Sequence, residues 1–267
     1  MNRKHIDSSK NPLIKEIVRL RERRERDRSG KFVIEGVREV ERALAAGVPL
    51  DEVLLASDLA KPEAFAIVSR AEREGIRVTE LTTQAFDRAS IREHPDGVMA
   101  LAPTWRSDLF MLELPPTALL LVVEGLEKPG NLGALLRTAD AVDAYAVFVT
   151  GAGTDPFNPN VIRSSMGSLF SRPLVIAGSD EIRAFLRGRG VRIVATSPGA
   201  PLPFWDAHLV GPVALVLGAE HQGLGQEWLD SADEQVHIPM SGMADSLNVA
   251  TAGALVLYEA LRQRRLA

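Results

Sequence analysis

The sequence predicts an α/β protein made of two successive alternations of strands and helices. Short apolar runs alternate with amphipathic segments along most of the 267 residues, which is the pattern of an α/β fold. A proline-containing stretch without periodicity interrupts the alternation over residues 103–116. The apolar runs that follow are continuous, as in a parallel sheet covered on both faces. We therefore predict a small α/β domain over residues 1–102, a linker over 103–116, and a second α/β domain over 117–267.

Turn and cap residues define the elements expected in the first half. Asn11 and Pro12 are typical of a helix start, and apolar residues at helical spacing follow, with arginines on the rest of the same helix. Gly30, Gly47 and Gly75 are expected to end helices. The sequence thus predicts helices over 11–28, 37–46, 62–74 and 83–89, and strands over 32–34, 53–55, 76–78 and 97–101.

The second half predicts helices that begin with polar residues. Asn131 is expected to cap the first of them, and Asp245 or Ser246 the last. That last helix is almost wholly apolar and rich in small residues at its start, so we expect it to be buried in a core or at a subunit interface. Asn248 is the polar exception and, if buried, must hydrogen-bond a neighbouring loop or a ligand. The predicted helices are 132–142, 181–187, 227–231 and 247–263, and the predicted strands are 119–123, 146–149, 174–176, 192–195, 213–217 and 235–237.

Composition excludes several classes of protein. The chain has no cysteine, which excludes disulfides and thiolate metal sites and favours a reducing, cytoplasmic location. The five histidines are scattered without the spacing of metal ligands, so no metal site is expected. No apolar run approaches the roughly 20 residues of a membrane helix, and the polar first 31 residues do not form a signal peptide.

Charge is distributed unevenly along the chain. Residues 1–31 contain 11 Lys/Arg and 5 Asp/Glu, a net charge of +6, which leaves −10 on the remainder of a chain whose total is −4. A basic arm on an acidic body is one signature of nucleic-acid binding. The arm is also compatible with a salt-bridged, solvated helix face, because Glu22 and Glu25 lie among its arginines. Charge alone leaves both interpretations open.

Three short motifs at predicted strand-to-helix junctions point to chemistry. The first, residues 124–137, contains Asn131 and ends at Arg137, which can bind a phosphate or stabilise an oxyanion but is also compatible with a solvated surface arginine. The second, 218–225, has three glycines and can wrap a flat ring, or be an ordinary turn; it is not a dinucleotide-binding fingerprint. The third places residues 238–240 after a strand and 246–249 at the start of the last helix.

In this order, the three motifs resemble those of the TrmH/SpoU family of SPOUT-class RNA ribose 2′-O-methyltransferases. The resemblance covers residues 117–264, and within that range it includes the stretch 158–168. Residues 9–15, 32–36 and 96–98 are similar to the substrate-binding domain of the same family, a small α/β fold shared with some ribosomal proteins. That domain is more typical of the members that modify ribosomal RNA than of those that modify transfer RNA.

The resemblance implies a parallel-sheet catalytic domain with a C-terminal trefoil knot, an N-terminal RNA-binding domain, and S-adenosylmethionine as methyl donor. It implies a homodimer through the C-terminal helix. The implied cofactor-binding residues are Leu217, Gly218, Ile238, Met240 and Leu247. The implied catalytic residues, around the target ribose and the sulfonium, are Asn131, Arg137, Glu220, Ser246 and Asn248. RNA contacts are expected from Arg23, Arg24, Arg26, Arg28 and Arg163.

The implied reaction is attack of a ribose 2′-oxygen on the sulfonium methyl, most simply in 23S ribosomal RNA. Arg137 is the family's candidate for the 2′-hydroxyl proton, but arginine stays protonated in proteins, so it can instead stabilise the alkoxide or hold a phosphate. The alternatives are a tRNA ribose methyltransferase, an inactive RNA-binding protein of the same fold, and a base methyltransferase, which the 246–248 motif disfavours. The sequence does not identify the nucleotide, nor does it separate housekeeping modification from antibiotic resistance.

Overall fold

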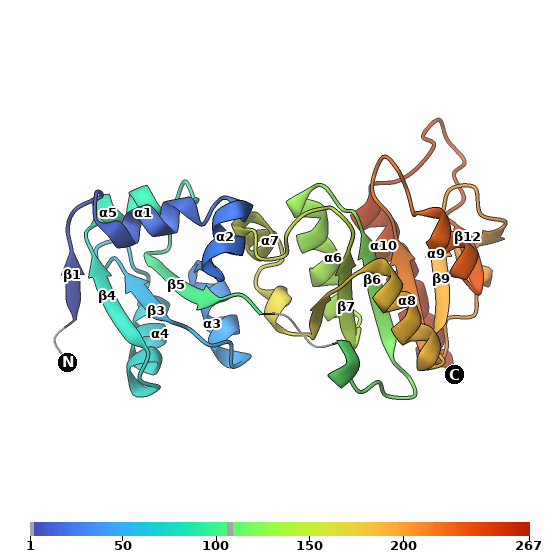
Figure 1. Cartoon of the computed structure of the whole chain (residues 1–267), viewed down its shortest axis with the longest axis horizontal. Coiled ribbons are helices and arrows are strands. Elements are labelled where there is room, and N and C mark those ends of the chain that lie inside the picture. The colour runs from blue at the N-terminus through green and yellow to red at the C-terminus, as the bar shows by residue number, and fades with distance from the viewer. Residues whose placement is uncertain (1–2, 106–108) are drawn as a thin grey trace. The chain divides into compact units, whose positions relative to one another are not determined.

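The computed structural model describes residues 3–105 and 109–267, which form two compact α/β units (Figure 1). The first unit contains Met1–Trp105 and Asp155–Ser171, and the second contains Arg106–Thr154 and Arg172–Ala267. The predicted α/β class is confirmed. Of the predicted linker 103–116, residues 106–108 lie outside the described ranges.

The first unit has a five-stranded mixed sheet in the order β1-β4-β3-β5-β2. Strands β1, β4 and β3 are parallel, and β5 runs antiparallel to both β3 and β2. Helices α1 and α5 pack on each other and share one hydrophobic cluster with the sheet, and α3 packs on α4. The strands are β1 (Lys4–Ile6), β2 (Lys31–Glu35), β3 (Glu52–Leu55), β4 (Arg77–Leu81) and β5 (Val98–Pro103); the helices are α1 (Pro12–Arg19), α2 (Arg23–Ser29), α3 (Val37–Ala45), α4 (Pro62–Arg73) and α5 (Thr83–Ala89).

The single basic helix predicted up to residue 28 is wrong, because the chain breaks it into α1 and α2. Leu20 ends α1 with its side chain buried in the core, and Glu22 adopts an extended conformation before α2. The break leaves backbone carbonyls without helical partners. Arg26 satisfies two of them, donating from Nη1 to the carbonyl oxygens of Leu20 at 2.7 Å and of Arg21 at 2.8 Å. A buried arginine therefore stabilises the corner between the two helices.

Residues 155–171 belong to the first unit although they lie between β7 and β8 of the second unit in sequence. They form helix α7 (Pro159–Ser164) and a 3-10 turn (Ser168–Phe170). The ring centroids of Phe157 and Phe170 lie 4.9 and 6.5 Å from that of Phe32. Asp155 forms a buried ion pair with Arg26 at 2.6 Å. Aromatic packing and this ion pair thus hold a distant segment of chain on β2 and α2, which the sequence does not predict.

The second unit has a seven-stranded sheet in which every pair is parallel, in the order β10-β12-β9-β11-β6-β7-β8. The predicted parallel sheet is confirmed, with β10 as an additional short strand at its edge. The strands are β6 (Leu119–Glu124), β7 (Ala146–Thr150), β8 (Leu174–Ile176), β9 (Arg192–Thr196), β10 (Leu202–Pro203), β11 (Val213–Leu217) and β12 (Glu234–His237). Short 3-10 turns cover Leu109–Met111 and Phe204–Asp206.

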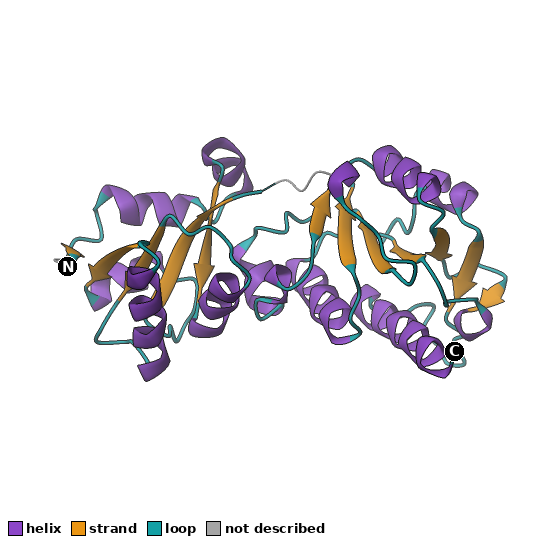
Figure 2. Cartoon of the chain, turned by 90° about the horizontal axis from the view of Figure 1, so that it is seen from below, coloured by secondary structure: helices purple, strands orange, loops and turns teal. Residues whose placement is uncertain are grey.

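Helices cover both faces of this sheet (Figure 2). Helices α8 (Ser179–Gly188) and α9 (Gln226–Ser231) contribute to a cluster that contains Val122 and Val216. Helices α6 (Pro129–Ala141) and α10 (Val249–Leu266) pack on each other. Gly253 of α10 packs closely against Leu135 and Leu217, because a Cβ atom there would displace the ends of both leucine side chains. Successive strand residues point to opposite faces, so Leu217 and α10 lie on the face opposite to Val216 and α8.

Candidate functional site

The three predicted motifs meet at one edge of the second sheet. Strands β6, β11 and β12 run parallel, so their carboxyl ends lie at the same edge. The loops that follow them are residues 125–128, 218–225 and 238–248, and these hold the residues singled out in the sequence. In open parallel sheets, ligands bind at this edge. The topology therefore turns three separate sequence motifs into one region.

A network of polar side chains joins the three loops. Asn131, in the first turn of α6, donates from Nδ2 to the carboxylate of Glu220 in the loop after β11. Asn248, at the start of α10, donates from Nδ2 to Oδ1 of Asn131 at 3.1 Å. The backbone N–H of Glu127 donates to the other carboxylate oxygen of Glu220 at 3.4 Å. Three of the five residues implied as catalytic are thus linked by hydrogen bonds, with Asn131 in the middle and Glu220 and Asn248 on either side of it.

Two predicted helix caps are wrong, and the correction explains this network. Helix α6 begins three residues earlier than expected, at Pro129, so Asn131 lies inside its first turn and its side chain is free for Glu220. Helix α10 is capped by Asn248, which accepts from the N–H of Ala250 at 3.0 Å, and not by Asp245 or Ser246. Asn248 is exposed rather than buried. Its oxygen caps the helix while its amide nitrogen reaches Asn131.

The charge state of Glu220 follows from its contacts. Partial burial opposes ionisation, but the hydrogen bond from Asn131, backbone N–H groups and the charge of Lys128 outweigh it, so the pKa of Glu220 lies below the usual value of 4.5. Glu220 is therefore an anion at neutral pH and can only accept hydrogen bonds. A fixed negative charge at this edge suits a cationic ligand group.

Arg137 and Ser246 do not take part in the network. Arg137 is exposed on α6, and no hydrogen bond or ion pair within residues 3–105 and 109–267 engages its guanidinium. Ser246 is exposed in the loop before α10. The structure thus places Arg137 on the helix that carries Asn131, with its five N–H donors available to a ligand.

The residues implied to hold the cofactor lie in or beside two loops, 218–225 and 238–248. The two loops differ in how many backbone hydrogen bonds they form. Leu217 is buried at the end of β11, and Gly218 follows. A Cβ atom on Gly218 would lie 2.2 Å from the backbone carbon of Gly223, because Ala219 and Gly223 exchange backbone hydrogen bonds of 3.1 and 2.9 Å. This loop therefore turns back tightly on itself, and only glycine fits at its base.

The other loop leaves its backbone groups open. Within the described residues, no backbone–backbone hydrogen bond engages residues 238–247. Ile238 and Leu247 are half-buried and Met240 is 36% exposed. His237 Nδ1, just before this loop, is buried and makes no hydrogen bond within the described part of the chain. Apolar side chains beside unpaired backbone donors and acceptors fit a flat, heteroatom-rich ligand such as S-adenosylmethionine.

Glu124, the first residue of the motif 124–137, positions the loops of this edge, although the sequence alone assigned it no role. Its Oε1 accepts hydrogen bonds from Ser179 Oγ and Trp228 Nε1, both at 2.9 Å, and its Oε2 accepts from the N–H of Gly225 at 2.9 Å. One carboxylate thus ties β6 to α8, α9 and the loop after β11. The available signal was an acidic residue at the end of an otherwise apolar strand, which is costly to place there without partners.

The arginines expected to contact RNA differ in their availability. Arg23, Arg24, Arg28 and Arg163 are exposed on α2 and α7 of the first unit. Arg26 is only 2% exposed and is occupied by Asp155 and two carbonyl oxygens. Its guanidinium therefore has a structural role, and we do not retain it among the RNA contacts.

The described residues contain neither a metal site nor a membrane-spanning helix. No group of three His, Asp or Glu side chains there could hold a metal ion. No helix within residues 3–105 and 109–267 is long and apolar enough to cross a membrane.

The protein has two α/β units and a candidate ligand site at one edge of a parallel sheet. Comparisons with known proteins identify its class. The profile of the SpoU rRNA Methylase family matches residues 118–258, and that of the MRM3-like substrate binding domain matches residues 11–100. The chain belongs to the SpoU rRNA methylase family. The prediction of an S-adenosylmethionine-dependent RNA 2′-O-methyltransferase is confirmed at the level of this family.

Individual relatives agree with this assignment. The chain is 32% identical to a 23S rRNA (uridine(2479)-2′-O)-methyltransferase of Streptomyces viridochromogenes, over 91% of this chain and 86% of the relative. It is 29% identical to the 23S rRNA (guanosine(2553)-2′-O)-methyltransferase RlmP of Bacillus subtilis, over 96% and 98%. A solved structure of an AdoMet-bound rRNA methyltransferase from Sinorhizobium meliloti is 30% identical with a TM-score of 0.90, covering 97% of this chain and 98% of that one.

Proposed function

We propose that this protein transfers a methyl group from S-adenosylmethionine to a ribose 2′-hydroxyl of 23S ribosomal RNA. The observation that carries the proposal is the contact between Asn131, Glu220 and Asn248, which brings the three family motifs to one edge of the parallel sheet. Relatives that cover most of the chain act on 23S rRNA, and residues 11–100 match a substrate-binding domain.

Leu217, Gly218, Ile238, Met240 and Leu247 would hold the cofactor. S-adenosylmethionine supplies a methyl group already activated on a sulfonium, so the protein's contribution is mainly alignment and exclusion of water. Half-buried Ile238 and Leu247 offer apolar contact, and the open backbone of residues 238–247 offers hydrogen bonds to the edge of a ring. The carboxylate of Glu220 would favour the cationic end of the cofactor.

Arg137, with Asn131, Ser246 and Asn248, would surround the target ribose. The guanidinium of Arg137 stays protonated, so its role is to hold a phosphate or to stabilise the developing alkoxide while another group accepts the proton. Its exposure and its open donors support this role. Asn131 and Asn248 hold each other through one hydrogen bond, which fixes the orientation of both amides beside the ribose.

The assembly we propose is a homodimer through α10. Leu255 and Tyr258 are 40% and 52% exposed on the middle of this helix, while Val256 and Leu257 between them are buried in the unit. An apolar outer face on an already packed helix suits a second protein surface. Light scattering at micromolar concentration should give the mass of a dimer, and the double change L255E/Y258E should give that of a monomer. A wild-type monomer would contradict the proposal.

Three further elements of the prediction complete the proposal. They are a trefoil knot formed by the C-terminal chain, a division of labour between an RNA-binding first unit and a catalytic second unit, and a cytoplasmic location. The predicted split into 1–102 and 117–267 is kept except for residues 155–171, which belong to the first unit. The exposed residues Arg23, Arg24, Arg28 and Arg163 support RNA affinity in the first unit.

The decisive experiment separates the competing functions. Isothermal titration measures S-adenosylmethionine binding, and transfer of a labelled methyl group is then measured on 23S rRNA and on bulk tRNA. We expect cofactor binding and labelling of 23S rRNA at one ribose. Labelling of tRNA alone would make the protein a tRNA methyltransferase, and cofactor binding without transfer to either RNA would indicate an inactive RNA-binding protein.

A further inference from the structure

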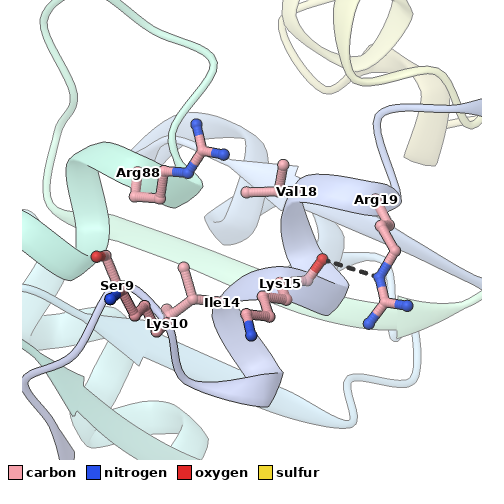
Figure 3. A pocket seen from close by; sticks show the side chains of 7 residues that line it. All are labelled: Ser9, Lys10, Ile14, Lys15, Val18, Arg19 and Arg88. Carbon is pink, nitrogen blue, oxygen red and sulfur yellow. Dashed lines mark hydrogen bonds between the residues drawn. The ribbon is translucent and has the colours of Figure 1, made fainter.

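The first unit contains a basic pocket whose lining residues belong to none of the three methyltransferase motifs. It has a volume of about 500 Å³ and lies along helix α1, with Arg88 contributed by α5 (Figure 3). Ile14 and Val18 provide its apolar surface. Its polar lining consists of four cationic side chains and one hydroxyl: Lys10, Lys15, Arg19, Arg88 and Ser9.

Three of the four cations of this pocket make no polar side-chain contact with another described residue. The side chains of Lys10, Lys15 and Arg88 are exposed and make no hydrogen bond or ion pair with residues 3–105 or 109–267. Arg19 uses only Nε, which donates to the carbonyl oxygen of Lys15 at 3.2 Å. Lys15 and Arg19 lie one helical turn apart on α1, and an anion bound in the pocket would be attracted by these positive charges, which no carboxylate of the pocket lining neutralises.

A neighbouring pocket shows that this charge is not general to α1. It has a volume of about 270 Å³, shares Arg19, and is lined by the carboxylates of Glu16 and Glu25 together with Arg28. Arg28 is paired with Glu25 there. By contrast, no carboxylate of a described residue lines the basic pocket. Of the two pockets, only the basic one has the charge to hold a polyanion.

The composition of the basic pocket favours a nucleic-acid backbone over a base or a free nucleotide. It offers no aromatic ring for stacking and no amide side chain to pair with a base edge, which are the usual means of base recognition. Lysine and arginine ends beside aliphatic side chains suit phosphates and the apolar edges of riboses. Ser9 and Lys10 also precede the start of α1, where the helix dipole favours negative charge.

We infer that this pocket binds the phosphodiester backbone of the RNA substrate, independently of sequence. The inference rests on the proposed function for the identity of the polyanion. It assigns the electrostatic part of RNA affinity to a defined site between α1 and α5. The arginines of α2 then contribute less, since Arg26 is buried and Arg28 is paired.

The test compares two variants of the full-length protein that each lose three positive charges from the first unit. The pocket variant is K10Q/K15Q/R88Q. The matched control is K4Q/R38Q/R73Q, whose three cations are exposed and line neither of the two pockets. Binding of fluorescein-labelled 12-nucleotide oligouridylate and oligoadenylate is measured by anisotropy at several salt concentrations.

The pocket variant should bind both oligonucleotides at least about 10-fold more weakly at low salt, and the slope of log K against log salt should fall by roughly 0.7 per lost phosphate contact. The control should stay within about two-fold of wild type with an unchanged slope. The variant K10R/K15R/R88K keeps the charges and should bind as the wild type does. Equal losses in the pocket variant and the control would overturn the inference, as would wild-type binding by the pocket variant.

Two further measurements distinguish RNA binding at this pocket from binding of an acidic protein, and from the proposed methyl transfer. Competition by polyglutamate as strong as competition by oligouridylate would point to an acidic protein partner and overturn the assignment to RNA. Methyl transfer is measured in parallel: the pocket variant should have a raised KM for RNA with unchanged S-adenosylmethionine affinity. If the wild type transfers no methyl group, the proposed function fails, while the oligonucleotide measurements still decide whether the pocket binds RNA.

Discussion

Two carboxylates at the same edge of the second sheet have different surroundings. Glu124 accepts three hydrogen bonds from Ser179, Trp228 and Gly225, all supplied by the fold itself. Glu220 lies in a loop and contacts Asn131, whose other amide atom contacts exposed Asn248. The difference separates architecture from function: a carboxylate surrounded by internal donors holds loops in place, whereas one that ends an exposed polar network is available to a ligand.

Arg137 differs most from Glu124, because no described residue forms a hydrogen bond or ion pair with its guanidinium. Arg137→Ala should leave the fold and S-adenosylmethionine affinity intact and lower methyl transfer by about 10²–10³-fold, the usual effect of removing one transition-state contact. Arg137→Lys should also fail, because an ammonium does not reproduce the planar donor fork. Single-turnover transfer with titration of the cofactor checks both, and near-normal turnover in Arg137→Ala would remove this residue from the ribose site.

The structural half of the comparison is tested at Glu124. Glu124→Ala leaves the indole N–H of Trp228, a fully buried side chain, without its acceptor. We expect a loss of about 3 kcal/mol in the free energy of unfolding, together with weaker cofactor binding because Gly225 loses its fixed position. Urea unfolding followed by Trp fluorescence measures the first effect. Glu124→Gln keeps one acceptor oxygen and should lose less; stability equal to wild type in Glu124→Ala would refute the role.

Asn248 has both a structural and a functional role, since it caps α10 and also belongs to the polar network with Asn131 and Glu220. Asn248→Ala should cost about 1 kcal/mol of stability through the lost cap and should also reduce methyl transfer. Asn248→Asp keeps the capping oxygen but cannot donate to Asn131. It should therefore recover stability but not turnover. Recovery of both properties would show that the hydrogen bond to Asn131 is not needed for transfer.

The smallest expected effect is the pH dependence of Glu220. Its pKa is lowered in the folded protein, so the ionised form contributes stability that is complete above the unfolded value near 4.5 and is lost as pH falls through the lower folded value. The difference in unfolding free energy between wild type and Glu220→Gln should be constant from pH 6 to 8 and should shrink below about pH 4. A difference that grows on acidification would reverse the assigned sign.

The sequence predicts the parallel sheet and most helices because continuous apolar runs and glycine stops are local signals. It does not choose among neighbouring polar residues that can all cap a helix. Asp245, Ser246 and Asn248 are each suitable, and Asn248 is selected by a partner 117 residues away. The early start of α6 had a local signal in Pro129, which is favoured at the first helical position.

The buried role of Arg26 lay beyond single-sequence reasoning for the same reason. Its partner Asp155 is 129 residues distant, and the surrounding arginines are exposed. Composition therefore suggested a uniform basic arm, while long-range packing removes one member from the surface. The resemblance singled out Glu220 because family motifs record such distant contacts. It gave no role to Glu124, the first residue of the motif 124–137.

The position of residues 155–171 determines which truncated forms of the protein can fold. A cut in the linker yields a C-terminal fragment that still contains Phe157 and Phe170 but has lost Phe32 and the Arg26 partner of Asp155. The complementary N-terminal fragment loses Phe157 and Phe170, two of the aromatic side chains that pack on Phe32. Neither piece is a self-contained folding unit, so one break in the chain exposes apolar surface on both products, and deletion mapping would report misfolding where it is meant to report function.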